Sequence, residues 1–343
     1  MSGEQPRGGA PRVPRLSLGE RSGLEVSKFA MGTWGIGTSP SATSMGDDDD
    51  AIVEVLEAAF DAGINYLDSA EMYQNEERLG RLLRQARNTP ADLVIASKFG
   101  RDDFTGPGYR ASVERSLEQL GLEKLPLMLI HDPRTKEHMD VVLGKGGALE
   151  EFRRMQDEGI LGAIGIGTGT LEPLRIAVDS GEFDVIQFPR LYTLVLRAAK
   201  TSGLLTAAKA RGMGTMIAGP FTGNILATGV RGVENPLYAY WAALPEVVDA
   251  VGRMQDRCDE LGVSIQQAAI AYTATEPLID AVVVGVRTIA ELEMNVESLG
   301  LHVSRDDLES IALAGDLDET LLGGPDFVLP FPADRKPAPP AAN

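Results

Sequence analysis

Short apolar runs alternate with longer amphipathic segments along most of this chain. Eight runs rich in Val, Ile and Leu predict β-strands at Phe29–Thr33, Ile64–Asp68, Leu93–Ser97, Leu127–Ile130, Gly162–Ile166, Phe183–Phe188, Gly214–Ala218 and Ala281–Val284. Continuous apolar runs are typical of parallel strands that are buried on both faces. Eight of them in strict alternation with helices predict a (β/α)8 barrel, the TIM barrel of the α/β class.

Two of the intervening segments carry strong helix signals. In Ala243–Leu261 apolar residues recur every three or four positions, and Gly262 follows as a stop signal. The acidic run Asp47–Asp50 precedes a second periodic segment, and carboxylates favour a helix N-terminus. We interpret this run as a helix start rather than a metal site, because four consecutive acids cannot all face one ion.

An open Rossmann sheet is the alternative fold. Its phosphate-binding turn needs glycines at a fixed spacing at the start of a helix. The glycines at Gly32, Gly35 and Gly37 have a different spacing, which favours the barrel.

Length and hydrophobic pattern predict one barrel domain over residues 16–330. Residues 1–15 mix Gly, Pro and Arg without the apolar segment of a secretory signal, so we expect a disordered leader, and the Pro- and Ala-rich residues 331–343 predict a flexible tail. No run of about 18 apolar residues could cross a membrane. A cytoplasmic protein is therefore expected.

Charge and cysteine content narrow the possible partners. The formal net charge of −18 disfavours nucleic acid, since polyphosphate would be repelled. Cys258 is the only cysteine, which excludes an internal disulfide and any multi-cysteine metal site, and we expect it to be buried in a helix.

Polar residues at the ends of the predicted strands are the candidates for chemistry, because functional groups of such barrels gather at the carboxyl ends of the strands. Asp68 ends the second strand, Tyr73 follows in its loop, Lys98 follows the third strand and His131 the fourth. Taken singly, each has an ordinary structural interpretation as a turn, surface or rim residue. Their occurrence on successive strands predicts one shared site.

This set of residues suits proton transfer coupled to hydride transfer. A phenol with a pKa of about 10 is a poor acid near neutral pH. A neighbouring ammonium favours the phenolate, and a carboxylate keeps that ammonium charged. Tyr73 is thus the expected general acid or base, and Lys98 and Asp68 form the pair that adjusts its pKa. His131 is expected to orient the substrate oxygen or to help relay the proton.

The motifs around these residues resemble the aldo-keto reductase family. The resemblance rests on Gly63–Gly80, Ala96–Phe99, Leu129–Pro133, Ala163–Gly167, Gly219–Phe221, Ile225–Gly229 and Val284–Arg287, and it covers roughly Phe29 to Leu313. It implies an aldo-keto reductase barrel that binds NAD or NADP without a Rossmann domain. The implied cofactor contacts are Asp68, Thr168, Gln187, Phe221, Leu226, Gly285, Arg287, Glu291 and Asn295.

The chain also departs from the pattern of many family members. Ala218 stands where many carry an aromatic residue that stacks on the nicotinamide, so Phe221 or Tyr192 would have to replace it. Glu291 stands where a phosphate-binding arginine is common, which favours NAD, although Arg287 nearby could serve a 2′-phosphate.

Within the family, the motifs look most like the branch of fucose, galactose and threo-aldose 1-dehydrogenases and pyridoxal dehydrogenase. This implies oxidation of a ring hemiacetal to a lactone, with Trp34, Tyr73 and His131 lining the substrate pocket and the loop Glu234–Trp241 covering it. The alternatives are an NADPH-dependent reductase of small carbonyl compounds, a regulatory subunit like the β-subunits of potassium channels, and a Schiff-base aldolase using Lys98. No metal is expected, and the chain is expected to be a monomer or homodimer.

Overall fold

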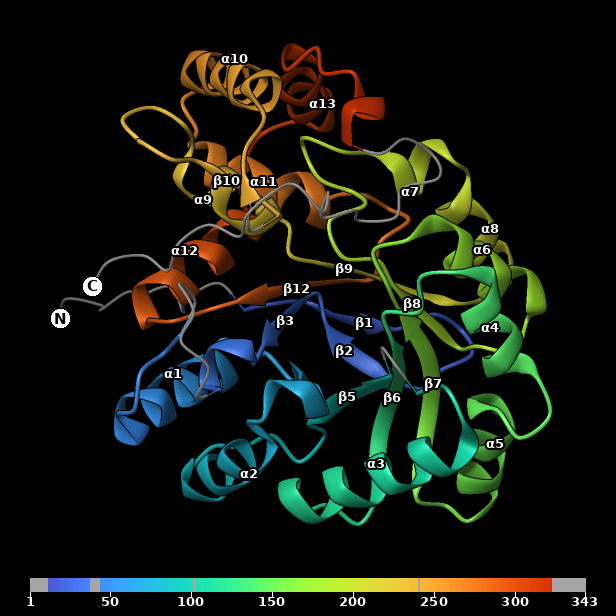
Figure 1. The fold of residues 1–343 in the computed structure, drawn as a ribbon. Coiled ribbons are helices and arrows are strands. Elements are labelled where there is room, and N and C mark those ends of the chain that lie inside the picture. The colour runs from blue at the N-terminus through green and yellow to red at the C-terminus, as the bar shows by residue number, and fades with distance from the viewer. Residues whose placement is uncertain (1–11, 38–43, 101–102, 240, 323–343) are drawn as a thin grey trace, which may run out of the picture.

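Eight parallel strands close into a barrel in the computed structural model, which describes residues 12–37, 44–100, 103–239 and 241–322 (Figure 1). Around the barrel the strands follow the order β12, β3, β4, β5, β6, β7, β8, β9. Their bounds are β3 (Phe29–Gly32), β4 (Tyr66–Asp68), β5 (Val94–Gly100), β6 (Leu125–His131), β7 (Leu161–Gly167), β8 (Val185–Gln187), β9 (Gly214–Ala218) and β12 (Ala281–Gly285). All eight predicted strands are present, β9 with the predicted bounds and the others with shifted ends, and the (β/α)8 barrel is confirmed.

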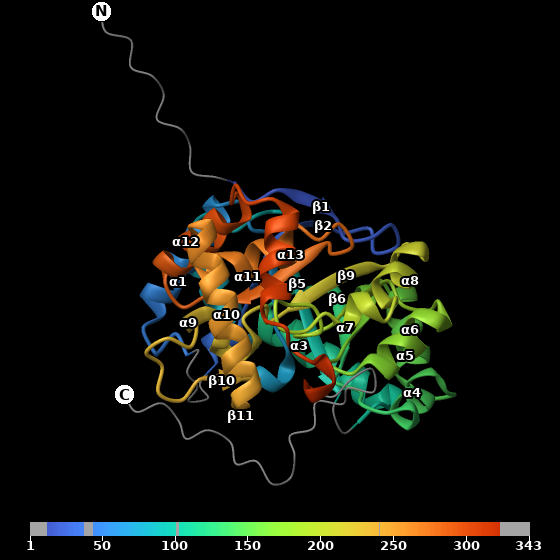
Figure 2. The same ribbon diagram turned by 90° about the horizontal axis from the view of Figure 1, so that it is seen from above.

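Helices surround the barrel, and α10 and α13 lie side by side across one flank (Figures 1 and 2). The helices are α1 (Asp49–Asp61), α2 (Glu76–Gln85), α3 (Gly106–Leu120), α4 (Lys136–Leu143), α5 (Ala148–Asp157), α6 (Leu171–Ser180), α7 (Ala198–Thr201), α8 (Leu204–Ala210), α9 (Ile225–Thr228), α10 (Pro245–Leu261), α11 (Ile265–Ala274), α12 (Ile289–Leu299) and α13 (Arg305–Ala314). Short 3₁₀ turns are η1 (Trp34–Ile36), η2 (Glu71–Tyr73), η3 (Thr222–Asn224) and η4 (Glu319–Leu322). In the described part of the chain no helix is long and apolar enough to cross a membrane.

Both helices with strong sequence signals form as expected. The Asp48 side chain accepts a hydrogen bond from the Ala51 amide and so caps α1, which confirms the helix start. Helix α10 ends at Leu261, and the following Gly262 has a φ of 69°, the left-handed conformation that glycine adopts at little cost. Cys258 is buried in this helix, as predicted.

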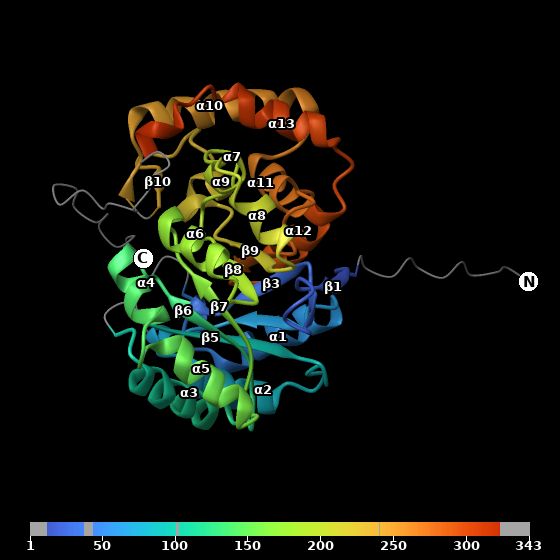
Figure 3. The ribbon, with the colours of Figure 1, turned by 90° about the vertical axis from the view of Figure 1, so that its right-hand side faces the viewer.

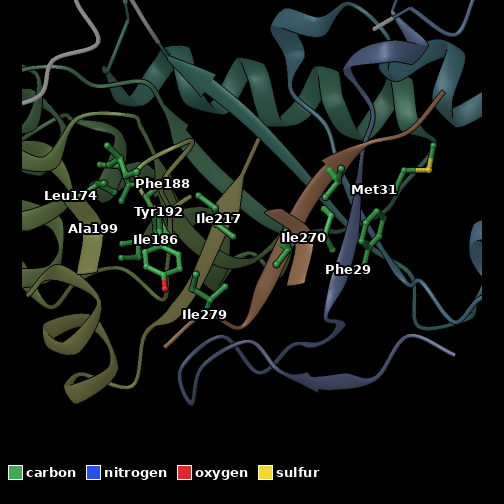
Figure 4. Packing of buried hydrophobic residues seen from close by; sticks show 14 of the residues in the cluster. Phe29, Met31, Leu174, Ile186, Phe188, Tyr192, Ala199, Ile217, Ile270 and Ile279 are labelled. Carbon is green, nitrogen blue, oxygen red and sulfur yellow. The ribbon is translucent and has the colours of Figure 1, made fainter. Parts of the chain in front are cut away.

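Alternate residues of each strand face opposite sides of the barrel wall. Ala30, Leu127 and Leu129 belong to the cluster inside the barrel, together with Tyr66, Val94, Ala96, Ala163, Val185, Met216, Ala281 and Val283. Their neighbours Phe29, Met31, Met128 and Ile130 belong to the larger cluster between barrel and helices, part of which is shown in Figure 4. This alternation decides which side chains reach the barrel axis at the strand ends.

A short antiparallel hairpin, β1 (Arg15–Ser17) and β2 (Glu25–Ser27), covers one end of the barrel. Leu18 and Val26 from it join the inner cluster, and Figure 3 shows β1 at the end opposite to β10 (Leu237–Tyr238). The prediction of a disordered leader over residues 1–15 is wrong for the end of that range, because Val13 is buried and Arg15 begins β1. Residues 1–11, and the expected tail 331–343, lie outside the described residues.

Candidate active site

Strand alternation brings three of the predicted site residues to the inner face of the barrel mouth. Asp68 lies two residues beyond Tyr66 on β4, and Lys98 lies two residues beyond Ala96 on β5. His131 lies two residues beyond Leu129 at the end of β6. These three side chains therefore lie on the same face as the inner cluster, and they meet at the carboxyl ends of adjacent strands.

Lys98 is the centre of a buried polar cluster. Its Nζ donates to Asp68 Oδ1 at 2.6 Å, to the Ser69 carbonyl at 2.7 Å and to the Tyr73 hydroxyl at 3.4 Å. The other carboxylate oxygen, Asp68 Oδ2, accepts from Gln187 Nε2 at 2.7 Å. Lys98 and Asp68 are only 2% and 3% exposed, so water contributes little to the solvation of these two charges.

The charge on Lys98 is favoured by its surroundings. Burial alone would lower its pKa, but the Asp68 carboxylate and the Tyr73 hydroxyl outweigh this effect and raise the pKa above its usual value. A Schiff-base lysine must instead lose its proton to become a nucleophile. This arrangement therefore disfavours the aldolase alternative and fits an ammonium that acts on Tyr73.

Two aromatic side chains pack against the ring of Tyr73. The rings of Tyr73 and His131 meet edge to face with centroids 6.3 Å apart, and the Trp34 ring lies 5.1 Å from that of Tyr73. Trp34 is 46% exposed, which is unusual for so large an apolar side chain. The structure thus brings all three predicted substrate residues together.

The opposite half of the barrel mouth is lined mostly by small residues, apart from Gln187 at the end of β8. The inner positions at the ends of β3, β7, β9 and β12 are Gly32, Gly167, Ala218 and Gly285. A Cβ added at Gly285 would meet nothing within 4 Å, and one at Gly32 would make only ordinary contacts beyond 3.4 Å. The mouth therefore has a polar half, which carries Asp68, Lys98 and His131, and an open half, where small residues leave room for a flat ring.

The loop after β9 offers backbone for an anion. Gly219, Thr222, Gly223 and Asn224 all have positive φ values, between 51° and 130°, and such mixed left- and right-handed backbone forms concave amide sites for phosphates. The buried Thr222 Oγ1 has no hydrogen-bond partner here. Phe221 is half-buried in this loop, whereas the Leu226 side chain is wholly buried in the outer core, so only the backbone of Leu226 can face a ligand.

The segment after β12 carries the remaining predicted cofactor residues. Asn295 is 1% exposed and its Oδ1 atom has no hydrogen-bond partner. Arg287 donates to Glu291 through Nε at 2.9 Å and through its backbone amide at 2.8 Å. These orphaned polar atoms, the anion loop and the open half of the mouth together fit a dinucleotide.

Two sequence interpretations change with the structure. Tyr192 cannot stack on a nicotinamide, because it is wholly buried against Tyr272, with ring centroids 5.1 Å apart, and its hydroxyl donates to Glu276. The Thr168 hydroxyl is already engaged, since it donates to the Pro133 carbonyl at 2.9 Å and accepts from the Thr170 amide at 3.2 Å.

The loop expected over the pocket forms a small hairpin. It pairs β10 with β11 (Trp241–Ala242), and the Ala239 amide donates to the Thr222 carbonyl. The hairpin therefore rests on the anion loop. Within the described ranges no group of three or more His, Cys, Asp or Glu side chains is placed to hold a metal ion.

Comparison with known proteins identifies the family. The model of the aldo/keto reductase family matches residues 28–315, and the chain belongs to this family. It is 31% identical over 311 residues to D-threo-aldose 1-dehydrogenase of a Pseudomonas species, covering 82% of this chain and 92% of that protein. It is 27% identical over 318 residues to pyridoxal 4-dehydrogenase of Microbacterium luteolum, covering 80% and 90% of the two chains.

A solved structure agrees on the fold. The putative aldo-keto reductase PA4992 of Pseudomonas aeruginosa superimposes with a TM-score of 0.63 at 24% identity, covering 90% of this chain and all of that one. With the family established, the protein is an NAD(P)-dependent oxidoreductase.

Proposed function

We propose that the protein oxidises the anomeric hydroxyl of a cyclic aldose to the corresponding lactone and reduces NAD. The observation that carries the proposal is the buried chain of contacts from Asp68 through Lys98 to the Tyr73 hydroxyl. The similarity to D-threo-aldose 1-dehydrogenase supports an aldose as substrate. The reaction balances as aldose plus NAD⁺ giving lactone, NADH and one proton.

Each member of the cluster has a distinct part in this reaction. Tyr73 removes the proton from the anomeric hydroxyl, and the Lys98 ammonium stabilises the tyrosinate that carries out this step. Asp68 keeps Lys98 charged and fixed in direction, and His131 orients the substrate oxygen. A bound nicotinamide would supply the acceptor for the hydride of the anomeric carbon. Trp34 offers its exposed face to the sugar ring.

A panel of substrates tests the proposal. Aldoses, pyridoxal and simple aldehydes are each assayed with NAD(H) and NADP(H) in both directions by absorbance at 340 nm. We expect the highest kcat/KM for an aldose with NAD⁺, with a lactone as the isolated product. A clear preference for reducing simple aldehydes with NADPH would overturn the proposal in favour of a carbonyl reductase.

The preference for NAD is assigned to Glu291. Its carboxylate forms an ion pair with the Arg287 guanidinium, so this cation is not available to a ribose 2′-phosphate. The Glu291 carboxylate itself would repel the phosphate. Glu291→Gln keeps the size of the side chain and removes this charge. It should strengthen NADPH binding relative to NADH by about tenfold, equivalent to about 1.4 kcal/mol.

Fluorescence titration with both reduced cofactors measures this ratio. Glu293→Gln is the matched control, because it removes the same charge from an exposed position on the same helix. An unchanged ratio in Glu291→Gln, or an equal change in the control, would reject the role of Glu291.

A further inference from the structure

Tyr73 is carried by a three-residue turn rather than by a strand. The turn η2 follows β4, and after it Gln74 adopts a left-handed conformation with φ of 52°. So short a turn has few hydrogen bonds of its own. The position of the Tyr73 hydroxyl relative to Lys98 therefore depends on what anchors the chain on either side.

Before Tyr73 the anchor lies on the outer surface of the barrel. The Glu71 carboxylate accepts hydrogen bonds from Ser112 Oγ at 2.6 Å and Arg115 Nε at 2.8 Å, both on α3. These contacts hold the turn against a helix. They do not reach the strand ends that carry Asp68 and Lys98.

After Tyr73 the anchor lies inside, and it is the amide of Asn75. This side chain is 1% exposed, and its Nδ2 donates to the Thr33 carbonyl at 2.6 Å and to Thr33 Oγ1 at 3.2 Å. Its Oδ1 accepts from Ser69 Oγ at 3.0 Å. The amide nitrogen of Asn75 thus contacts Thr33 at the end of β3, and its amide oxygen contacts Ser69 at the end of β4.

Those two strand ends belong to the site. The Thr33 amide and hydroxyl both donate to the Asp68 carbonyl, at 3.0 and 3.1 Å. The Ser69 carbonyl accepts from Lys98 Nζ at 2.7 Å. Asn75 therefore connects the chain that follows Tyr73 to Thr33 and Ser69, which form hydrogen bonds with the Asp68 carbonyl and the Lys98 ammonium.

The ordinary interpretation of Asn75 is a helix cap, and the contacts exclude it. Asn75 occupies the position before α2 where an Asn side chain usually accepts a hydrogen bond from the helix amides. Here the side chain makes no such bond. Its hydrogen-bonding groups are directed into the barrel end instead.

We propose that Asn75 is a positioning residue that fixes the Tyr73 hydroxyl against the Lys98 ammonium, an inference that rests on the role proposed for Tyr73. The contact between these two groups is 3.4 Å long, so a further displacement would weaken it markedly. Misplacement by about 1 Å can cost on the order of 10²-fold in rate.

Asn75→Ala tests the proposal. We expect kcat per active site to fall by about 10- to 100-fold, with active sites counted by NADH titration and the Kd of NADH changing less than about twofold. Asn65→Ala is the matched control. Asn65 is also fully buried and makes hydrogen bonds to Ser27, Glu25 and Asp92, but at the opposite end of β4. The Asn65→Ala variant should be less stable than the wild type but should keep the wild-type kcat per active site.

A double-mutant cycle separates positioning from general loosening of the fold. If Asn75 acts through the Tyr73 hydroxyl, its removal should have little further effect in a Tyr73→Phe background, measured in single turnovers. Equal losses in both backgrounds, or a loss as large in Asn65→Ala, would overturn the proposal. An active Tyr73→Phe would instead reject the catalytic role of Tyr73, so the two failures are distinguishable.

Discussion

Replacing Tyr73 with phenylalanine is expected to lower kcat by about 10²–10⁴-fold, the range typical of a lost general acid or base. Phenylalanine keeps the ring, so the contacts to Trp34 and His131 can persist. Only the hydroxyl that meets Lys98 is removed. Because the dinucleotide contacts proposed above lie elsewhere, the Kd of NADH should change by less than about twofold.

Steady-state and single-turnover rates at 340 nm, together with NADH fluorescence titration, measure the two quantities. Tyr272→Phe is the control, because it removes a hydroxyl from another tyrosine, a fully buried ring that stacks on Tyr192 outside the site. The assignment of Tyr73 fails if its variant keeps more than about a tenth of the wild-type kcat.

That the residues of the candidate site lie together could be predicted from the sequence, because they obey a general rule of parallel barrels. Asp68, Lys98 and His131 each stand directly at the end of an apolar run, and such ends meet at one mouth. Strand alternation then sets their direction, since each lies two residues beyond a member of the inner cluster. Local pattern and global fold agree at these positions.

Features that depend on distant partners could not be found in this way. Tyr192 follows β8 like a pocket residue, yet Tyr272 on α11 and Arg305 on α13 enclose it. The hairpin β1–β2 has strands of three residues each and no apolar run. The contacts of Asn75 could not be found either, because its hydrogen-bond partners, Thr33 and Ser69, come from two other segments.

Lys98→Met should cost about 3–5 kcal/mol in the free energy of unfolding, the usual penalty for removing one partner of a buried ion pair. Methionine nearly matches lysine in length, so the change removes charge more than volume. Asp68 would remain buried, with Gln187 as a hydrogen-bond donor but no counter-ion. Turnover should also be lost, since no ammonium would stabilise the Tyr73 phenolate.

Denaturant unfolding and activity measured on the same samples separate these two effects. Lys136→Met is the control, because Lys136 pairs with Asp140 on the surface, where an ion pair contributes about 1 kcal/mol or less. The double variant Asp68→Asn with Lys98→Met removes both charges, and it should regain most of the lost stability while staying inactive. If Lys98→Met is as stable as the wild type, Lys98 and Asp68 are not both charged in the folded protein. If the double variant is active, the ammonium is not needed for catalysis. Recovery of stability without activity would show that the charges of Asp68 and Lys98 are retained for the reaction rather than for the fold.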